Sequence, residues 1–216
     1  MDRVVILASG TWEDDEQARR LAASASFVIA ADGGFVGALR SAARVDLVVG
    51  DLDSIDAAGL DLLSRGSPAL QRHSTTKDAS DLELALDVAL ERRPARIDIV
   101  GALGGRLDHA LTNVHLLERG IDAGTVVRLI DGHQTVAVVA ARHGIEDARL
   151  GDSVSLIPLS STARVTTAGL RYPLQAERLV RSASRGVSNV VASLPASVDV
   201  SEGRLIVIHT SREVRA

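Results

Sequence analysis

Short apolar runs alternate with amphipathic segments through the first part of the chain, from residue 3 to about residue 130. The apolar runs have strand length, and the segments between them show the apolar spacing of helices. This alternation is typical of β-α-β units around a parallel sheet. The runs predicted to be strands are Val4–Ala8, Phe27–Ala31, Asp46–Val49, Ile97–Val100 and Val126–Ile130.

Three of the intervening segments carry signals for the start of a helix. Beyond Thr11, the acidic run Glu13–Glu16 complements the positive end of a helix. The segment Ser80–Glu83 has a capping-box pattern and is followed by apolar residues on one face. A third helix is predicted from about Asp108 to Arg119, with Gly120 ending it. Its inward face is predicted to carry Leu111, Val114 and Leu117.

The pattern changes after Asp131 and Gly132, where short β-branched runs are separated by Gly, Ser and Pro. Such spacing favours an all-β region. We therefore predict an α/β fold: a parallel α/β/α sandwich over residues 1–132, followed by a β-rich, sandwich-like domain over residues 133–216. The strands predicted in the second domain are Thr135–Ala140, Ser153–Pro158, Arg164–Thr167, Asn189–Ala192 and Leu205–Ile208.

Composition narrows the classes of function. The apolar share of 46% and charged share of 24% are ordinary for a folded globular protein. A net charge of -4 and an aromatic share of 2% disfavour nucleic-acid binding through a basic surface or base stacking. With no cysteine, the sequence excludes disulfides, thiolate metal sites and cysteine nucleophiles.

The amino-terminal apolar run is short and is preceded by Asp2 and Arg3, which is unlike a signal peptide. No apolar stretch approaches the roughly 20 residues that span a bilayer. We therefore expect a cytoplasmic protein with no membrane partner.

Acidic residues follow the third predicted strand and open the helix after Ser80. In an extended backbone residues two apart point the same way, so Asp51 and Asp53 should converge while Leu52 faces the packed side. Asp81 lies in the first turn of its predicted helix. Together these three carboxylates suit a hard cation such as Mg²⁺. A pair of aspartates in a solvated loop is the ordinary alternative.

Two glycine-rich segments also follow predicted strands. The first, Asp32–Gly34, permits tight backbone geometry, and an ordinary strand-to-helix turn is as good a reading as a nucleotide contact. The second, Gly101–Arg106, lacks both Walker A and dinucleotide spacing. Phosphate would bind there through Arg106 and backbone amides at the next helix start. His109 lies at that start, where a solvated histidine is the commoner outcome.

Four ordered motifs resemble those of the thiamine pyrophosphokinase family, and two further segments extend the resemblance over nearly the whole chain. The motifs are ADGG at 31–34, GDLDS at 50–54, STTKDASDLELAL at 74–86 and GALGGRLDHALTNVHLL at 101–117. The further segments are TTAGLRYPL at 166–174 and SRGVSNV at 184–190, which are similar to the family's thiamine-binding domain.

The resemblance implies transfer of the pyrophosphoryl unit of ATP to the hydroxyethyl group of thiamine, giving thiamine diphosphate and AMP. It implies that residues 1–132 are the catalytic domain, which binds ATP and Mg²⁺, and that residues 133–216 bind thiamine. The matching metal ligands are Asp51, Asp53 and Asp81, which also count as catalytic. Asp108 is a candidate to orient or deprotonate the thiamine hydroxyl. The residues expected to contact ATP are Asp32, Gly33, Lys77, Asp78, Arg106, His109 and Asn113.

Thiamine recognition is expected from Ser188 and Asn189, after a glycine that permits a tight turn. Eukaryotic-type members of the family place a tryptophan beside this segment, whereas here Arg185 and Gly186 precede it. Tyr172 is a possible substitute as the aromatic wall. The resemblance also implies a homodimer whose thiamine site lies between the catalytic domain of one subunit and the β domain of the other.

Two other functions remain open at this point. A haloacid-dehalogenase-like phosphatase would use Asp51 and Asp53 as nucleophile and acid, but in that class the pair follows the first strand, and here it follows the third. The other is a non-catalytic sensor of thiamine or nucleotide, against which the full set of carboxylates argues.

Overall fold

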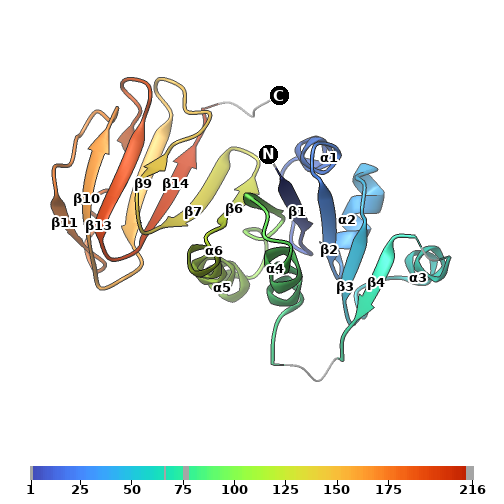
Figure 1. Ribbon diagram of the computed structural model, residues 1–216. Helices are drawn as coiled ribbons and strands as arrows, with labels where there is room; N and C mark the ends of the chain where they lie inside the picture. Colours follow the sequence, from blue (N-terminus) through green and yellow to red (C-terminus); the bar gives the residue numbers. More distant parts are fainter. Residues whose placement is uncertain (1, 66, 75–77, 213–216) are drawn as a thin grey trace. The chain divides into compact units, whose positions relative to one another are not determined.

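A computed structural model of the chain describes residues 2–65, 67–74 and 78–212. It divides into two compact units, residues 1–132 and residues 133–216 (Figure 1). Each unit has its own apolar core. Among the described residues, no helix has the length and apolar character needed to cross a membrane.

Unit 1 is built from alternating strands and helices. Its strands are β1 (Arg3–Leu7), β2 (Phe27–Ala31), β3 (Leu47–Gly50), β4 (Ala69–Arg72), β5 (Arg96–Val100) and β6 (Val126–Asp131). Its helices are α1 (Asp15–Ala23), α2 (Gly34–Ser41), α3 (Ala57–Ser64), α4 (Asp81–Glu91), α5 (Leu107–Leu116) and α6 (Glu118–Ala123). The strands run parallel in the order β6-β5-β1-β2-β3-β4.

Helices lie on both sides of this sheet (Figure 1). Helices α1 and α2 pack over Val5, Leu7 and Val28, and α4 contacts the central strands from the other side. With both faces covered, β1 is buried along almost its whole length, as expected for a parallel strand. The expected helix starts are confirmed, because Asp14 and Ser80 accept backbone N–H groups as the N-caps of α1 and α4.

The prediction of the third helix was wrong about the residue that ends it and about one residue of its inward face. Gly120 lies inside α6, and Gly124, in the left-handed conformation, ends that helix. Gly120 is needed for close approach, because a Cβ there would lie 2.4 Å from Cγ2 of Val127. Leu117 is buried as expected, but Leu111 is 57% exposed.

Unit 2 consists of two antiparallel sheets. Its elements are β7 (Gln134–Val139), β8 (His143–Gly144), β9 (Ser153–Pro158), β10 (Thr162–Ala168), β11 (Glu177–Val180), β12 (Asn189–Val190), β13 (Ser197–Glu202) and β14 (Leu205–Thr210). Four of its strands pair in the order β12-β9-β14-β7, and the other four pair in the order β11-β10-β13-β8. Side chains of both, including Leu156 and Val165, meet in one core. The predicted β-rich fold is therefore confirmed.

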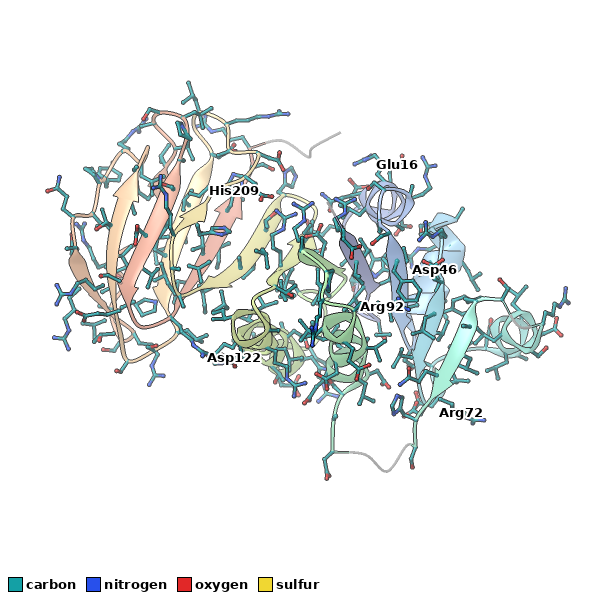
Figure 2. All side chains as sticks on the ribbon, viewed as in Figure 1. Glu16, Asp46, Arg72, Arg92, Asp122 and His209 are labelled. Carbon is teal, nitrogen blue, oxygen red and sulfur yellow. The ribbon has the colours of Figure 1, made fainter. Side chains whose placement is uncertain are left out.

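A buried hydrogen-bonded pair of side chains ties β14 to the loop before β9. His209, labelled in Figure 2, has its Nε2 atom 2.9 Å from Oδ2 of Asp152, and both residues are buried. Asp152 also accepts the backbone N–H of Arg149 and of Arg212. These bonds explain how a carboxylate remains in the interior of unit 2.

Candidate active site

A cleft of about 520 Å³ lies in unit 1 at the carboxyl ends of β1, β2, β3 and β5. In an open parallel sheet this is the edge where ligands bind. The segments after these strands and the first turns of α4 and α5 line it. Its lining includes Ser9, Gly10, Thr11, Asp32, Asp51, Asp53, Ser54, Ser80, Asp81, Gly101, Gly104, Gly105, Arg106, His109 and Asn113.

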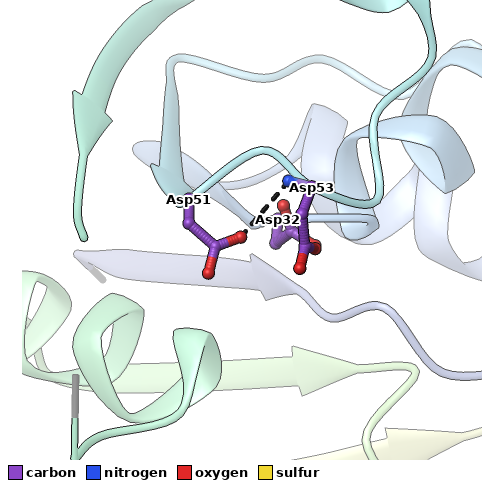
Figure 3. A group of neighbouring side chains, drawn as sticks. All are labelled: Asp32, Asp51 and Asp53. Carbon is purple, nitrogen blue, oxygen red and sulfur yellow. Dashed lines mark hydrogen bonds between the residues drawn. The ribbon is translucent and has the colours of Figure 1, made fainter. Parts of the chain in front are cut away.

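Three carboxylates gather in this cleft, as Figure 3 shows. One oxygen each of Asp32, Asp51 and Asp53 lies within 4.8 Å of the others. Asp32 is buried and accepts the backbone N–H of Leu52 on Oδ1 at 3.1 Å. Asp51 accepts the backbone N–H of Asp53 at 3.2 Å. Such a set of oxygen ligands fits a hard divalent cation, whose charge would offset their mutual repulsion.

The reason Asp51 and Asp53 converge differs from the expected one. The strand ends at Gly50, and Leu52 has a φ of 71°, so the segment is a turn and not extended backbone. Leu52 nevertheless packs inward, in a cluster with Ile55 and Phe35. The turn therefore brings Asp51 and Asp53 together and directs Leu52 inward, as the extended geometry also predicted.

Asp81 lines the same cleft from the first turn of α4. Gly50 makes room for this approach, because a Cβ there would lie 2.9 Å from Cβ of Asp32 and 3.2 Å from Oδ1 of Asp81. The three predicted metal ligands were Asp51, Asp53 and Asp81. The carboxylates that the structure brings together are Asp51, Asp53 and Asp32, and Asp32 was expected to contact ATP. Asp81 remains a predicted ligand at the margin of this group.

Arg106 and Asp108 form a two-pronged ion pair at the start of α5. Nε of Arg106 lies 3.1 Å from Oδ1 of Asp108, and Nη2 lies 2.5 Å from Oδ2. The Arg106 guanidinium, helped by the backbone N–H of His109, lowers the pKa of the Asp108 carboxyl to about 2. A carboxylate of this pKa is a weak base. Arg106 and His109 line the cleft, whereas Asp108 is outside its lining.

The other residues expected to contact ATP have different positions. The side-chain amide of Asn113 donates to Ala102 O at 2.8 Å, so this residue supports the glycine-rich segment as well as lining the cleft. Gly33 packs against Ser9 and Ser54, which both line the cleft. Asp78 is exposed and outside the lining, and Lys77 lies outside the described residues.

The three expected thiamine residues come together in unit 2. Asn189 is buried, and its Oδ1 accepts the backbone N–H of Tyr172 and of Val190. Its Nδ2 donates to Tyr172 O at 2.7 Å. This amide therefore holds the Tyr172 segment and has little left to offer a ligand. Ser188 and Tyr172, which is 57% exposed, remain accessible beside it.

Sequence reasoning missed the segment after β1. Ser9, Gly10 and Thr11 all line the cleft. A Cβ on Gly10 would lie 2.4 Å from Gly101 O, so glycine is required for the two loops to touch. Gly10, two residues after the end of the predicted strand Val4–Ala8, was the signal that could have found this segment.

Comparison with known proteins assigns both units. Residues 18–128 match the family described as thiamin pyrophosphokinase, catalytic domain, and residues 142–205 match its vitamin B1 binding domain. A thiamine pyrophosphokinase of Bacillus subtilis is 33% identical over 164 residues, which cover 75% of this chain and 77% of that protein. Thiamine pyrophosphokinase 2 of Arabidopsis thaliana is 28% identical over 71% of this chain and 61% of its own length.

Solved structures agree with these matches. The crystal structure of the Bacillus subtilis thiamine pyrophosphokinase superposes with a TM-score of 0.86 at 29% identity and covers 98% of this chain and 100% of that chain. The enzyme from Candida albicans, at 15% identity and a TM-score of 0.83, covers 97% of this chain and 89% of its own and shares the fold. The chain therefore belongs to the thiamine pyrophosphokinase family.

Proposed function

We propose that this chain is a thiamine pyrophosphokinase that transfers a pyrophosphoryl group from ATP to thiamine at the cleft of unit 1, with Mg²⁺ held by its carboxylates. The observation that carries the proposal is the convergence of Asp32, Asp51 and Asp53 within 4.8 Å beside the glycine-rich segments. All the candidate ligand atoms are carboxylate oxygens, which is the chemistry that Mg²⁺ prefers.

The reaction joins the hydroxyethyl oxygen of thiamine to the β-phosphorus of ATP and breaks the bond between that phosphorus and the oxygen bridging to the α-phosphate. AMP leaves, and the hydroxyl proton passes to solvent or a base. A bound Mg²⁺ would neutralise charge on the phosphate oxygens. Arg106 and the backbone amides at the start of α5 would orient the phosphates.

The Arg106–Asp108 pair suggests a role for Asp108 that differs from proton removal. Because its pKa is about 2, Asp108 stays ionised and accepts both prongs of the guanidinium. We propose that it holds Arg106 in position for a phosphate group. Removal of the hydroxyl proton by Asp108 itself stays a prediction.

The decisive assay is release of AMP and formation of thiamine diphosphate, followed by mass detection. We expect both products when ATP, thiamine and Mg²⁺ are present, and loss of both in excess chelator, with recovery when Mg²⁺ is restored. Full activity in chelator would refute the metal proposal. Phosphate release with an aspartyl-phosphate at Asp51 would favour the phosphatase alternative, and binding without products would favour the sensor.

Tyr172 is the proposed aromatic wall for thiamine. The residue is 57% exposed, while its backbone is fixed by Asn189. We expect Tyr172→Ala to raise the KM for thiamine about 10-fold, because stacking and cation–π contacts contribute on the order of 1–2 kcal/mol. The KM for ATP should stay unchanged, and Tyr172→Phe should restore thiamine binding. An equal rise in both KM values would show that the residue only shapes unit 2.

We also propose a homodimer in which residues 133–216 of one subunit complete the partner's site. The support is that catalytic and thiamine-recognition motifs lie in different domains of the family. At thiamine concentrations well below the raised KM of the Tyr172→Ala variant, mixing a subunit carrying Asp53→Asn with one carrying Tyr172→Ala should give more activity than either variant alone, since a mixed dimer contains one intact site. Demonstrated subunit exchange without any gain in activity would count against the shared site.

A further inference from the structure

Trp12 is the one tryptophan of the sequence, and it lies in the connection between β1 and α1. Its side chain is buried and is outside the lining of the cleft. The indole Nε1–H donates to Ala8 O at 2.9 Å. Ala8 itself lines the cleft at the end of β1, so the indole holds the backbone of the cleft wall from behind.

The same ring contacts the glycine-rich segment after β5. A Cβ added to Gly101 would lie 2.2 Å from Nε1 of Trp12 and 2.4 Å from its Cδ1. On the other side, a Cβ on Gly37 would lie 2.6 Å from Cζ2. Glycine at both positions therefore lets the backbones of residue 101 and of α2 pack directly on the indole.

The two loops that the indole supports also approach each other closely at their glycines. Gly10 N–H donates to Gly101 O at 3.0 Å, and a Cβ on Gly104 would lie 2.8 Å from Thr11 O. No long side chain separates these segments, so their spacing depends on what lies behind them. Trp12 is in contact with both.

The outward side of the indole is covered by a charge pair. The Arg40 guanidinium lies 5.6 Å from the ring centroid, and its Nη2 lies 2.6 Å from Oδ1 of Asp15. Arg40 therefore links α2 to α1 across the ring. The indole is enclosed by α1, α2 and the two cleft loops.

We infer that Trp12 is a positioning residue for the nucleotide: it fixes residues 8–11 and 101–104 relative to each other so that their backbone can bind the ATP phosphates. The inference rests on the proposed function, because it assigns these loops to ATP. Thiamine is expected to be affected little, since its recognition is assigned to unit 2. A buried carbonyl that loses its donor also disfavours the native loop position.

The kinetic test compares Trp12→Phe, which keeps an aromatic ring but removes the N–H donor, with Trp12→Leu, which removes the ring as well. We expect the KM for ATP to rise roughly 10-fold in Trp12→Phe and further in Trp12→Leu, with the KM for thiamine within about twofold of the parent value. Phe27→Leu is the matched control, because Phe27 is an aromatic at the opposite end of β2, outside the cleft. It should leave both KM values unchanged.

A spectroscopic test needs no turnover and keeps the parent chain. Because Trp12 is the single tryptophan, its emission reports on the cleft loops alone. We expect an α,β-methylene analogue of ATP with Mg²⁺ to change the emission saturably, and thiamine alone to leave it unchanged. Arg40→Gln should keep the response to the analogue, because Arg40 contacts only the outer side of the ring.

The outcomes separate this inference from the proposed function. An enzyme that forms thiamine diphosphate, but whose Trp12 variants keep the parent KM for ATP, would overturn the role of Trp12 and leave the function standing. Equal changes in both KM values, or emission indifferent to the nucleotide analogue, would also overturn it. A nucleotide response in a chain that forms no product would support the inference and refute the function.

Discussion

Replacing Asp51 or Asp53 by Asn is expected to lower turnover at least about 100-fold, because each removes a charged ligand from the site that stabilises the transferring phosphates. The fold should be kept, since neither side chain is in the apolar core. Asp32→Asn should have an effect of similar size if Asp32 belongs to the metal site, as its position suggests. Steady-state product formation and calorimetric titration with Mg²⁺ would measure turnover and metal affinity.

The matched control for these variants is Asp56→Asn. Asp56 follows Asp53 by three residues and caps α3 by accepting the backbone N–H of Gly59 at 2.8 Å. Asparagine caps a helix as well as aspartate, so this variant removes a nearby charge without loss of structure. Its turnover should match that of the parent. A variant of Asp51 or Asp53 with parent turnover and Mg²⁺ affinity would remove that residue from the metal site.

Asp98→Ala is expected to reduce the free energy of unfolding of unit 1 by about 3–5 kcal/mol, because it leaves buried positive charge uncompensated. Asp98 is 0% exposed and accepts Nε–H of Arg128 on Oδ1 at 2.9 Å. Its Oδ2 lies 3.2 Å from Nε of Arg96 and 3.7 Å from Nη1 of Arg3. Burial lowers the pKa of Arg3. The negative charge of Asp98 opposes this decrease, and the neighbouring arginines add to it.

Urea unfolding followed by Trp12 emission would measure this loss, because Trp12 lies in unit 1. The control is Asp61→Ala, which breaks the exposed pair of Asp61 on α3 with Arg65, the residue after that helix, and should cost about 0–1 kcal/mol. The loss of unfolding free energy for Asp98→Asn should lie between those of Asp98→Ala and Asp61→Ala, since asparagine removes the charge but keeps a hydrogen-bond acceptor. A loss for Asp98→Ala as small as the control's would mean that water reaches the arginines and solvates them.

The strands of unit 1 were predictable where both of their faces are covered. Continuous apolar runs indicated β1 and β2, and an apolar run interrupted only by Asp98 indicated β5; their bounds differ from the predicted ones by at most one residue at each end. The strand β4 was missed, because Ala69–Arg72 contains no β-branched residue and all four side chains are exposed at the edge of the sheet. Arg72 ends this outer strand (Figure 2). This segment is a strand because it pairs with β3 in the folded sheet, and the local sequence alone does not indicate that pairing.

The sequence predicted which types of residue form the site, but not which side chains contact one another there. The place of Asp32 beside Asp51 and Asp53 depends on β2 lying next to β3 in the sheet. The sequence predicted that the side-chain amide of Asn189 binds a ligand, yet in the structure this amide makes hydrogen bonds with the backbone of Tyr172. Whether a polar side chain is satisfied within the protein depends on contacts distant in the sequence.

The strand order of unit 1 has a consequence for synthesis of the protein. The first strand, β1, lies between β2 and β5, and β5 begins at Arg96. On the ribosome, β1 therefore obtains its second neighbouring strand only after most of unit 1 has been translated, and the backbone N–H and C=O groups along that edge of β1 stay unpaired until then. Asp98 arrives with that strand and meets Arg3, which was made at the start. Emergence of β5 thus commits the nascent chain to fold, and chains that stop before it are expected to need chaperones.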